Sequence, residues 1–328
     1  MHIMNRKTLL PGLALVIALV AMLIAVLHRR PATDAPGVIA DPPPTMAPET
    51  VLPVPGTDPE PSRIAPHRDA DPAPEEDIAP VVVAVTTPDH PRRKWFAVYE
   101  LPGARSATET DRLISYLTDN PIGAYEYLGE EFAHRNYIMD VLREQRHAWP
   151  LVVNALAQVY AEPRQGDVLR GYALQHLASL YIDNPETLGA AQRTGILAVL
   201  RSALPLRGPT ALAATALVGL HEIARVDRAA VADTEVEQIA LDLLADPEAG
   251  DLARISALQI AGERRLTAAV PAARDLAADP QADWVVRMAA AWLLGQTGAD
   301  PALLATLTAD PDENVRHAAR AALSRKEP

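Results

Sequence analysis

From about residue 108 onward, the hydrophobic positions of the chain recur with the period of an α-helix. In the segment 315–323 the apolar residues fall at positions i, i+3, i+4, i+7 and i+8, which places them on one face of a helix. The same frame fits four earlier segments, whose first positions are residues 169, 212, 253 and 286. Successive first positions are therefore 43, 41, 33 and 29 residues apart, a spacing typical of repeats built from two helices.

Each of these five stripes is expected to bury one side of the second helix of a pair. The stripes comprise Leu169, Tyr172, Ala173, His176 and Leu177; Leu212, Thr215, Ala216, Gly219 and Leu220; Ala253, Ser256, Ala257, Ile260 and Ala261; Val286, Ala289, Ala290, Leu293 and Leu294; and Val315, Ala318, Ala319, Ala322 and Leu323. A first helix is expected before each one, over residues 149–162, 186–204, 235–246, 268–279 and 301–310. The turns "IDNP", "LADP", "GADP" and "TADP" join Asp or Asn to Pro, as in a helix cap followed by a first-turn proline. The pattern predicts an all-α solenoid of about five helical pairs.

Two of the segments carry a family resemblance. "DPDENVRHAARAAL" and "ADWVVRMAAAWLLGQTGADPALLATL" resemble HEAT repeats of the short type first associated with phycobilin lyases. The resemblance is strong over about residues 246–325 and weaker over 149–245, whereas residues 108–148 match only as generic helices. It implies an α-solenoid fold for the repeat domain.

The resemblance also implies a structural role for charged residues at the start of the second helices. An arginine follows the first stripe position in four of the five helices, and Ala213 replaces it in the other. In the family this arginine and an acid in the preceding turn form a hydrogen-bonded ladder between units. The corresponding pairs are Asp167 with Arg170, Asp251 with Arg254, Asp283 with Arg287, and Asp312 or Glu313 with Arg316. A guanidinium suits this role because its rigid fork can bind carboxylates and turn carbonyls together. His317 and Arg320 have no counterparts in the frame, and we interpret them as a polar cap on the last helix.

The N-terminal region differs from the helical one in composition. Leu9–Leu27 is an uncharged run of nineteen residues, which as a helix would span roughly 28 Å and so cross a bilayer. The run is followed by "HRRPATD" and not by a small-x-small cleavage site, which favours an uncleaved anchor over a cleaved signal peptide. Cations flank both ends of the run. A short N-terminal tail ahead of a signal-anchor most often stays in the cytoplasm, so we expect the soluble domain on the periplasmic or extracytoplasmic side. The Arg-, Ala- and Pro-rich, lysine-poor composition suggests a bacterium, so the membrane would be its cytoplasmic membrane.

A proline-rich segment connects this anchor to the helices. Residues 31–91 contain sixteen prolines, eleven acidic residues and two arginines, a net charge of 2 − 11 = −9. Such a segment cannot bury enough apolar surface to order itself, so we expect a disordered tether. Near its end, Val81–Thr87 and Arg92–Leu101 are compatible with a short strand pair or with a strand that adds to a partner's sheet. We favour instead a lead-in that docks Trp95, Phe96 and Tyr99 on the first helices. The chain then divides into a transmembrane signal-anchor (1–30), a tether with lead-in (31–107) and a repeat domain (108–328).

Charge and composition narrow the possible functions. The formal net charge is −12, from 30 Lys and Arg against 42 Asp and Glu, which speaks against nucleic acid as a partner. The chain has no cysteine, so disulfides, thiolate nucleophiles and cysteine-ligated metals are excluded. "HEIAR" (221–225) lacks the second histidine of a metalloprotease box, and His176 lies in an apolar stripe, as expected of a core histidine. The adjacent acids Glu130 and Glu131 point about 100° apart on a helix and cannot form an acid/base pair alone. We therefore predict no catalytic, cofactor-binding or metal-binding residues.

Three large side chains lie beside the stripe of one second helix. Trp284, Met288 and Trp292 are spaced i, i+4 and i+8, so they share a face. They are either a partner-binding hot spot or the filling of a joint between units, and we favour the joint. The sequence predicts a membrane-tethered scaffold that binds an unknown protein partner. The alternative is an enzyme, of lyase or other type, built on HEAT-like repeats with an unrecognised active site.

Overall fold

The computed structural model describes residues 78–87, 97–101, 103–119, 128–206 and 208–325. All described residues belong to one compact unit within Asp71–Pro328. The predicted anchor over residues 9–27, most of the predicted tether, and both Trp95 and Phe96 lie outside the described residues. Among the described residues, no helix combines the length and the apolar character needed to cross a bilayer.

The described residues fold into α-helices joined by turns and short 3-10 helices, as predicted. The α-helices are α2 (Pro80–Thr86), α4 (Ala107–Asp119), α5 (Leu128–Glu144), α6 (Trp149–Ala161), α7 (Gly166–Asp183), α8 (Ala190–Ala203), α9 (Leu212–Val226), α10 (Asp233–Ala245), α11 (Asp251–Glu263), α12 (Val270–Ala278), α13 (Trp284–Thr297), α14 (Pro301–Leu307) and α15 (Glu313–Ser324). The 3-10 helices are η1 (Arg146–Ala148), η2 (Pro163–Gln165) and η3 (Thr267–Ala269). The five predicted pairs are α6 with α7, α8 with α9, α10 with α11, α12 with α13, and α14 with α15.

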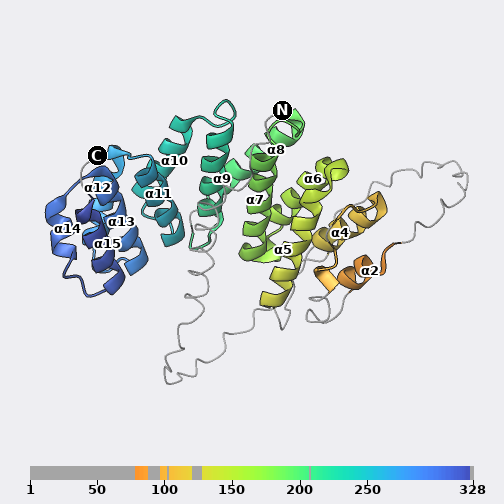
Figure 1. The fold of residues 1–328 in the computed structure, drawn as a ribbon, viewed down its shortest axis with the longest axis horizontal. Coiled ribbons are helices and arrows are strands. Elements are labelled where there is room, and N and C mark those ends of the chain that lie inside the picture. The colour runs from red at the N-terminus through yellow and green to blue at the C-terminus, as the bar shows by residue number, and fades with distance from the viewer. Residues whose placement is uncertain (1–77, 88–96, 102, 120–127, 207, 326–328) are drawn as a thin grey trace, which may run out of the picture. The chain divides into compact units, whose positions relative to one another are not determined.

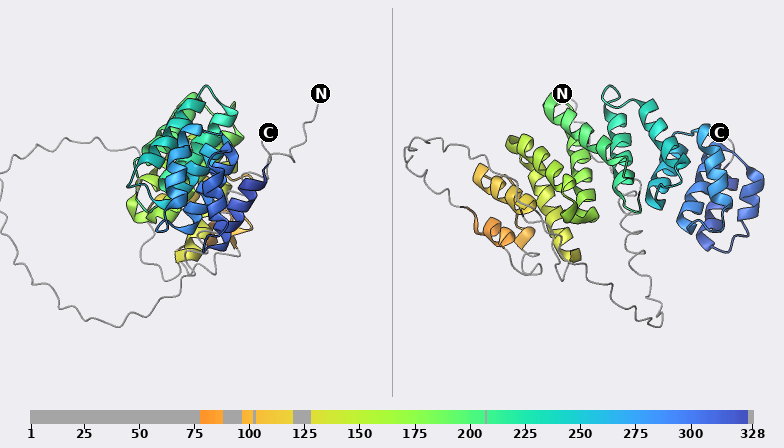
Figure 2. Two further views of the ribbon diagram at one scale, coloured as in Figure 1. Left: turned by 90° about the vertical axis from the view of Figure 1, so that its left-hand side faces the viewer. Right: turned by 180° about the vertical axis from the view of Figure 1, so that it is seen from behind.

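The pairs stack one after another, and their second helices form a continuous layer. Helix α7 packs on α9, α9 on α11, α11 on α13, and α13 on α15, while α5 packs on the other side of α7. Each first helix packs on the second helix of its own pair (Figure 1). Figure 2 shows the same succession of helices from behind. We call α7, α9, α11, α13 and α15 the second-helix layer. The all-α prediction with stacked HEAT-like pairs is confirmed for the described residues.

Small residues allow the second helices to approach closely. A Cβ atom added to Gly295 on α13 would lie 2.5 Å from the Cβ and 2.8 Å from the Cα of Ala322 on α15. A Cβ atom on Gly219 of α9 would lie 3.0 Å from the Cβ of Ala178 on α7. At these two contacts, small residues therefore let neighbouring second helices approach closely.

The predicted stripes are largely buried. All five positions of the stripes on α11 and α13 are buried, and so are four of the five on both α7 and α9. The exception to the pattern is Leu323 on α15, which is 41% exposed although the frame predicts it on the core face. The reason is that no further helix packs on that side of α15 among the described residues.

The lead-in differs from the strand prediction. Residues 80–86 form the helix α2, with Pro80 in its first turn and Val82 and Val85 buried. The backbone N–H of Ala79 donates to Glu109 Oε1 at 3.0 Å, which ties the start of α2 to α4. Packing against α4 therefore outweighs the β-propensity of the valines, and of the alternatives for this segment the strand is the one that the structure contradicts.

The other expected lead-in contact is made by an aromatic pair. The Tyr99 ring meets the Tyr137 ring of α5 edge to face, with centroids 5.3 Å apart, although Tyr99 remains 51% exposed. Val98 and Leu101 on either side of it are buried. The described part of the lead-in thus docks on the first helices mainly through aliphatic residues.

Candidate partner-binding surface

The first arginine of the predicted ladder joins the two helices of its own pair. Arg170 on α7 donates from Nε to the carbonyl of Tyr160 at 2.7 Å and from Nη1 to Asp167 Oδ1 at 2.8 Å. Its guanidinium also lies over the Tyr160 ring, 5.4 Å from the ring centroid, as in a cation–π contact. The structure thus brings Asp167 and Arg170 together and adds the end of α6 as a third partner.

Two further arginines bind turn carbonyls in place of the expected carboxylates. Arg254 donates to the carbonyl of Pro247 at 2.8 Å, and Arg316 donates to the carbonyls of Asp310 and Pro311 at 2.7 and 2.9 Å. Of the two acids expected to pair with Arg316, Asp312 instead caps α15 by accepting from the backbone N–H groups of residues 314 and 315, and Glu313 is exposed in the first turn of that helix. Asp251, expected to pair with Arg254, is exposed at the first turn of α11.

Among the four ladder arginines, Arg287 on α13 connects its own helical pair to the next one along the chain. Arg287 Nη2 donates to Oδ2 of Asp310, which lies in the turn between α14 and α15. The side chains are 10% and 3% exposed, respectively, so this is a buried ion pair. Asp310 Oδ1 also accepts the backbone N–H of Asp312 at 2.9 Å. Asp283, the expected partner of Arg287, caps α13 by accepting the N–H of Val285 at 2.9 Å.

The histidine in the α7 stripe is a core residue. His176 Nε2 lies 2.9 Å from Asn136 Oδ1 on α5. Burial, helped by the positive charge of Arg143, lowers the pKa of His176 to about 3, so the ring is neutral at physiological pH. The structure places this ring between α5 and α7, where it supports their packing.

The "HEIAR" histidine belongs to a polar network that links three helices. Arg264 Nε donates to His221 Nδ1 at 3.2 Å, so the ring proton is on Nε2, which lies 3.1 Å from Glu263 Oε2. The same guanidinium donates to Asp233 Oδ1 on α10 at 2.8 Å. The hydrogen bond from His221 lowers the pKa of Glu263. Among the described residues, no three His, Asp or Glu side chains are grouped as a metal site would need.

A second buried network, which the sequence did not reveal, lies near the start of the described helices. Tyr116 Oη and Arg135 Nε both donate to Glu131 Oε1 at 2.7 Å. Arg135 also donates to Gln165 Oε1 at 3.3 Å, and Gln165 donates to the carbonyl of Leu117 at 2.9 Å. Glu131 and Arg135 stand four residues apart on α5, a spacing visible in the sequence, but their burial depends on how α4 and η2 pack on them.

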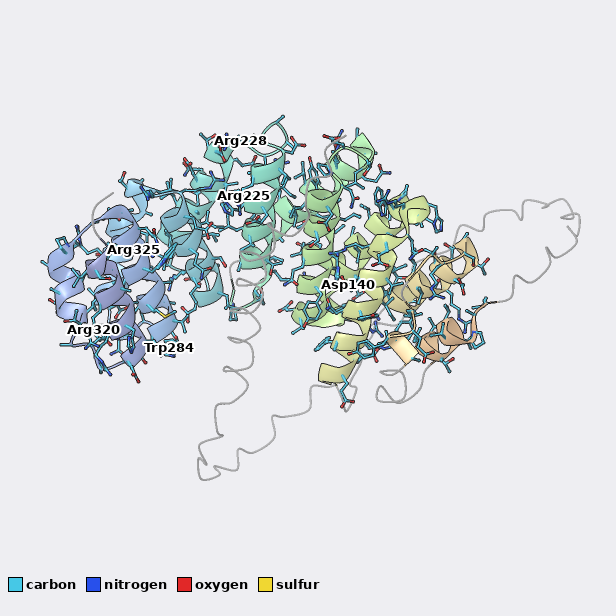
Figure 3. All side chains as sticks on the ribbon, in the orientation of Figure 1. Asp140, Arg225, Arg228, Trp284, Arg320 and Arg325 are labelled. Atoms are coloured by element: carbon cyan, nitrogen blue, oxygen red, sulfur yellow. The ribbon has the colours of Figure 1, made fainter. Side chains whose placement is uncertain are left out.

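The predicted aromatic stripe lies on α13 of the second-helix layer. Trp284, Met288 and Trp292 are all half-buried. A Cβ atom added to Gly262 on α11 would lie 2.8 Å from Cε3 of Trp292, so this indole covers the glycine and fills part of the joint between α11 and α13. Figure 3 labels Trp284 at the opposite end of the stripe, at the start of α13. Trp292 therefore has the joint role favoured for the stripe, whereas Trp284 and Met288 keep part of their surface accessible.

Comparison with known proteins supports the repeat assignment over part of the chain. The family model described as HEAT repeats matches residues 237–324. None of the curated proteins compared with the chain matches it. A solved structure of human deoxyhypusine hydroxylase in complex with glycerol is similar at 16% identity over 74% of this chain and 93% of that one, with a TM-score of 0.28. At that score the likeness carries no argument about this chain.

Proposed function

We propose that this HEAT-repeat chain is a membrane-tethered scaffold that binds a protein partner on its second-helix layer. The observation that carries the proposal is the face of α13, where Trp284 and Met288 keep part of their surface accessible. The core-facing stripe of the same helix consists of Val, Ala and Leu and is buried. Two large side chains outside that stripe are not needed to fill it. Trp and Met are residue types enriched where proteins bind one another.

The alternative of an enzyme is supported less well by the titratable side chains. His176 and His221 each lie between helices, where they take part in hydrogen bonds that hold those helices together. The buried carboxylate of Asp310 is neutralised by Arg287. In each case, a group able to act as acid or base is already engaged in packing, which favours binding over catalysis as the role of the fold.

The membrane attachment remains a proposal from the sequence. Residues 9–27 would anchor the chain, the acidic proline-rich segment would act as spacer, and the helices would lie on the extracytoplasmic side of a bacterial cytoplasmic membrane. The scaffold would then hold its partner at a distance from the bilayer that the spacer allows.

The experiment that tests this function is capture of partners from intact membranes. The full chain, with an affinity tag at its C-terminus, is crosslinked in the membrane and purified, alongside a Trp284→Ala, Met288→Ala variant. The matched control is Leu151→Ala, which removes a 52% exposed apolar side chain from the first helix α6. Partners that the wild type and the control retain and the double variant loses support the proposal. Equal retention by all three chains contradicts it.

Protease accessibility settles the orientation in the same preparation. Protease added outside spheroplasts should digest the helical unit while the membrane stays intact. Protection of that unit would place it in the cytoplasm and refute the extracytoplasmic arrangement.

A further inference from the structure

His221 on α9 stands between an acid and an arginine that are adjacent in the chain at the end of α11. Its Nε2 lies 3.1 Å from Glu263 Oε2, and its Nδ1 accepts a hydrogen bond from Arg264 Nε at 3.2 Å. The side chain of His221 is 7% exposed. A neutral imidazole has one donor and one acceptor nitrogen, and these two contacts use both of them. The ring can therefore make both contacts at once only while it is neutral.

The end of α11 has a fixed backbone conformation. Arg265 adopts a left-handed conformation with φ 53°, and the N–H of Leu266 donates to the carbonyl of Ala261 at 2.8 Å, as in a Schellman motif. Glu263 and Arg264 are therefore presented to α9 from a well-defined turn. A change of charge on α9 is expected to move their side chains and not the turn itself.

Arg264 has partners on α10 as well as on α9. Its Nη1 donates to Asp233 Oδ1 at 2.8 Å and lies 3.5 Å from Glu237 Oε1. Arg228, in the turn after α9, pairs with the same Asp233 at 3.3 Å, but its side chain is 77% exposed (Figure 3). The guanidinium of Arg264 therefore keeps two carboxylates on α10 when its hydrogen bond to the ring is lost.

Two further charged groups near the ring lie on α9 itself. Glu222 Oε1 is 4.0 Å from His221 Nε2, and Arg225 Nη1 donates to that carboxylate at 3.2 Å. Helices α7 and α8, which pack on other sides of α9, contribute no hydrogen bond or ion pair to the ring within the described part of the chain. The ring thus faces carboxylates at Nε2 and a guanidinium at Nδ1.

Protonation of the ring would affect these contacts unequally. It places a hydrogen on Nδ1, so Arg264 loses its acceptor and faces a second positive charge. The side chains of His221 and Arg264 are 7% and 12% exposed, so little water screens that repulsion. The gain at Nε2 is smaller, because Glu263 is 49% exposed and Glu222 is shared with Arg225. The loss at Nδ1 therefore outweighs the gain at Nε2.

We propose that His221 makes the joint between α9 and α11 sensitive to pH. The neutral ring holds Arg264 against α9, whereas the protonated ring releases Arg264, which stays bound to Asp233 and Glu237 on α10. Histidine is the residue type whose charge ordinarily changes between about pH 5 and 8, so the joint loosens when the surroundings become acidic. This joint lies within the helical repeats and operates whichever partner the chain binds.

The test follows hydrogen exchange in the full chain in detergent at about pH 7.5 and about pH 5, with exchange times corrected for the intrinsic effect of pH. Release of Arg264 removes a hydrogen bond from a charged group, so the amides of residues 216–226 and 256–266 should exchange about 10-fold faster at the lower pH. His221→Gln should abolish this increase, because a glutamine side chain can accept from Arg264 and donate to Glu263 at either pH. Spectra of 15N-labelled histidine, assigned by the signal that His221→Gln lacks, report the charge of the ring.

Three further variants separate this joint from general effects of acid. Arg264→Met removes the guanidinium and should exchange fast at both pH values. Glu263→Gln removes the carboxylate and should keep the response to pH. His147→Gln, at an exposed position in η1, is the matched control and should respond like the wild type.

Three results would overturn the proposal: a His221 ring that stays neutral at about pH 5, exchange that does not change although the ring becomes charged, or a response that His221→Gln retains. Loss of the response in Glu263→Gln would also contradict it, since the charge of that carboxylate would then control the joint.

Discussion

Removal of the Arg287 guanidinium tests most sharply the view that the repeated arginines are structural. In Arg287→Ala, the Asp310 carboxylate would stay in the turn between α14 and α15 with its side chain 3% exposed and without its cation. The backbone N–H of Asp312, 2.9 Å from Oδ1, would still stabilise it in part. A buried charge that loses its partner typically costs 3–5 kcal/mol, so we expect a loss of about 3 kcal/mol in the free energy of unfolding.

The other ladder arginines should matter less, because their partners are of a different kind. Arg254 and Arg316 donate to turn carbonyls, and two of these three hydrogen bonds are exposed, so water can replace the guanidinium there. Losing such hydrogen bonds costs about 1 kcal/mol. The variants Arg254→Ala and Arg316→Ala therefore show how much unfolding free energy is lost when an arginine bound only to carbonyls is removed. Arg228→Ala, at a side chain 77% exposed, shows the loss for an arginine on the surface.

The assay is urea unfolding of the full chain in detergent, followed by circular dichroism, with a double-mutant cycle. Asp310→Asn keeps an acceptor for the Asp312 N–H and removes the negative charge. Combined with Arg287→Ala it should cost less than the sum of the two single changes by at least about 1 kcal/mol. A loss below about 1 kcal/mol for Arg287→Ala, or additivity in the cycle, would show that Asp310 does not depend on Arg287 for its burial.

Other variants probe the joints and the core histidine. Gly295→Ala should destabilise the chain by about 1–3 kcal/mol in the same assay, because its Cβ would lie 2.5 Å from the Cβ of Ala322. Ala322→Gly removes that Cβ and should restore part of the loss, and no rescue would mean that the clash lies elsewhere. Trp292→Ala should lower the melting temperature, with a loss of about 2 kcal/mol, and an unchanged melt would contradict its role in the joint. The unfolded chain protonates His176 near its ordinary pKa of 6.5, whereas the folded chain resists protonation down to about 3. The wild type should therefore lose about 1.4 kcal/mol more per pH unit than His176→Gln as the pH falls from 6 to 4, and parallel pH profiles would show that the ring is not buried neutral.

The sequence predicted the helical pairs well because their cause is local. The apolar residues of the α13 stripe, from Val286 to Leu294, are spaced so that only a helix places them all on one side. In turns such as "GADP", the aspartate caps the helix that follows. Val82 and Val85 show the limit of that reasoning. Their β-branched side chains favour a strand in isolation, and the packing of α2 on α4, which no local pattern displays, decides for a helix.

The candidate site was predictable in its residues and not in its contacts. The spacing of Trp284, Met288 and Trp292 identifies a shared face, but only the approach of Gly262 shows which indole fills the joint. Likewise, the frame identifies Arg287 as one of a series, yet its partner Asp310 comes from the next pair along the chain. Contacts between units depend on the offset between stacked helices, which the repeat length alone does not give.

Binding of a protein to the face of α13 that carries Trp284 and Met288 can be detected by site-specific photocrosslinking in intact membranes. A photoreactive residue at Met288 should form a crosslink to a distinct protein partner, and the same residue at Leu151 on α6 should not. Absence of a crosslink at Met288, or the same crosslinked proteins from both positions, would contradict the account.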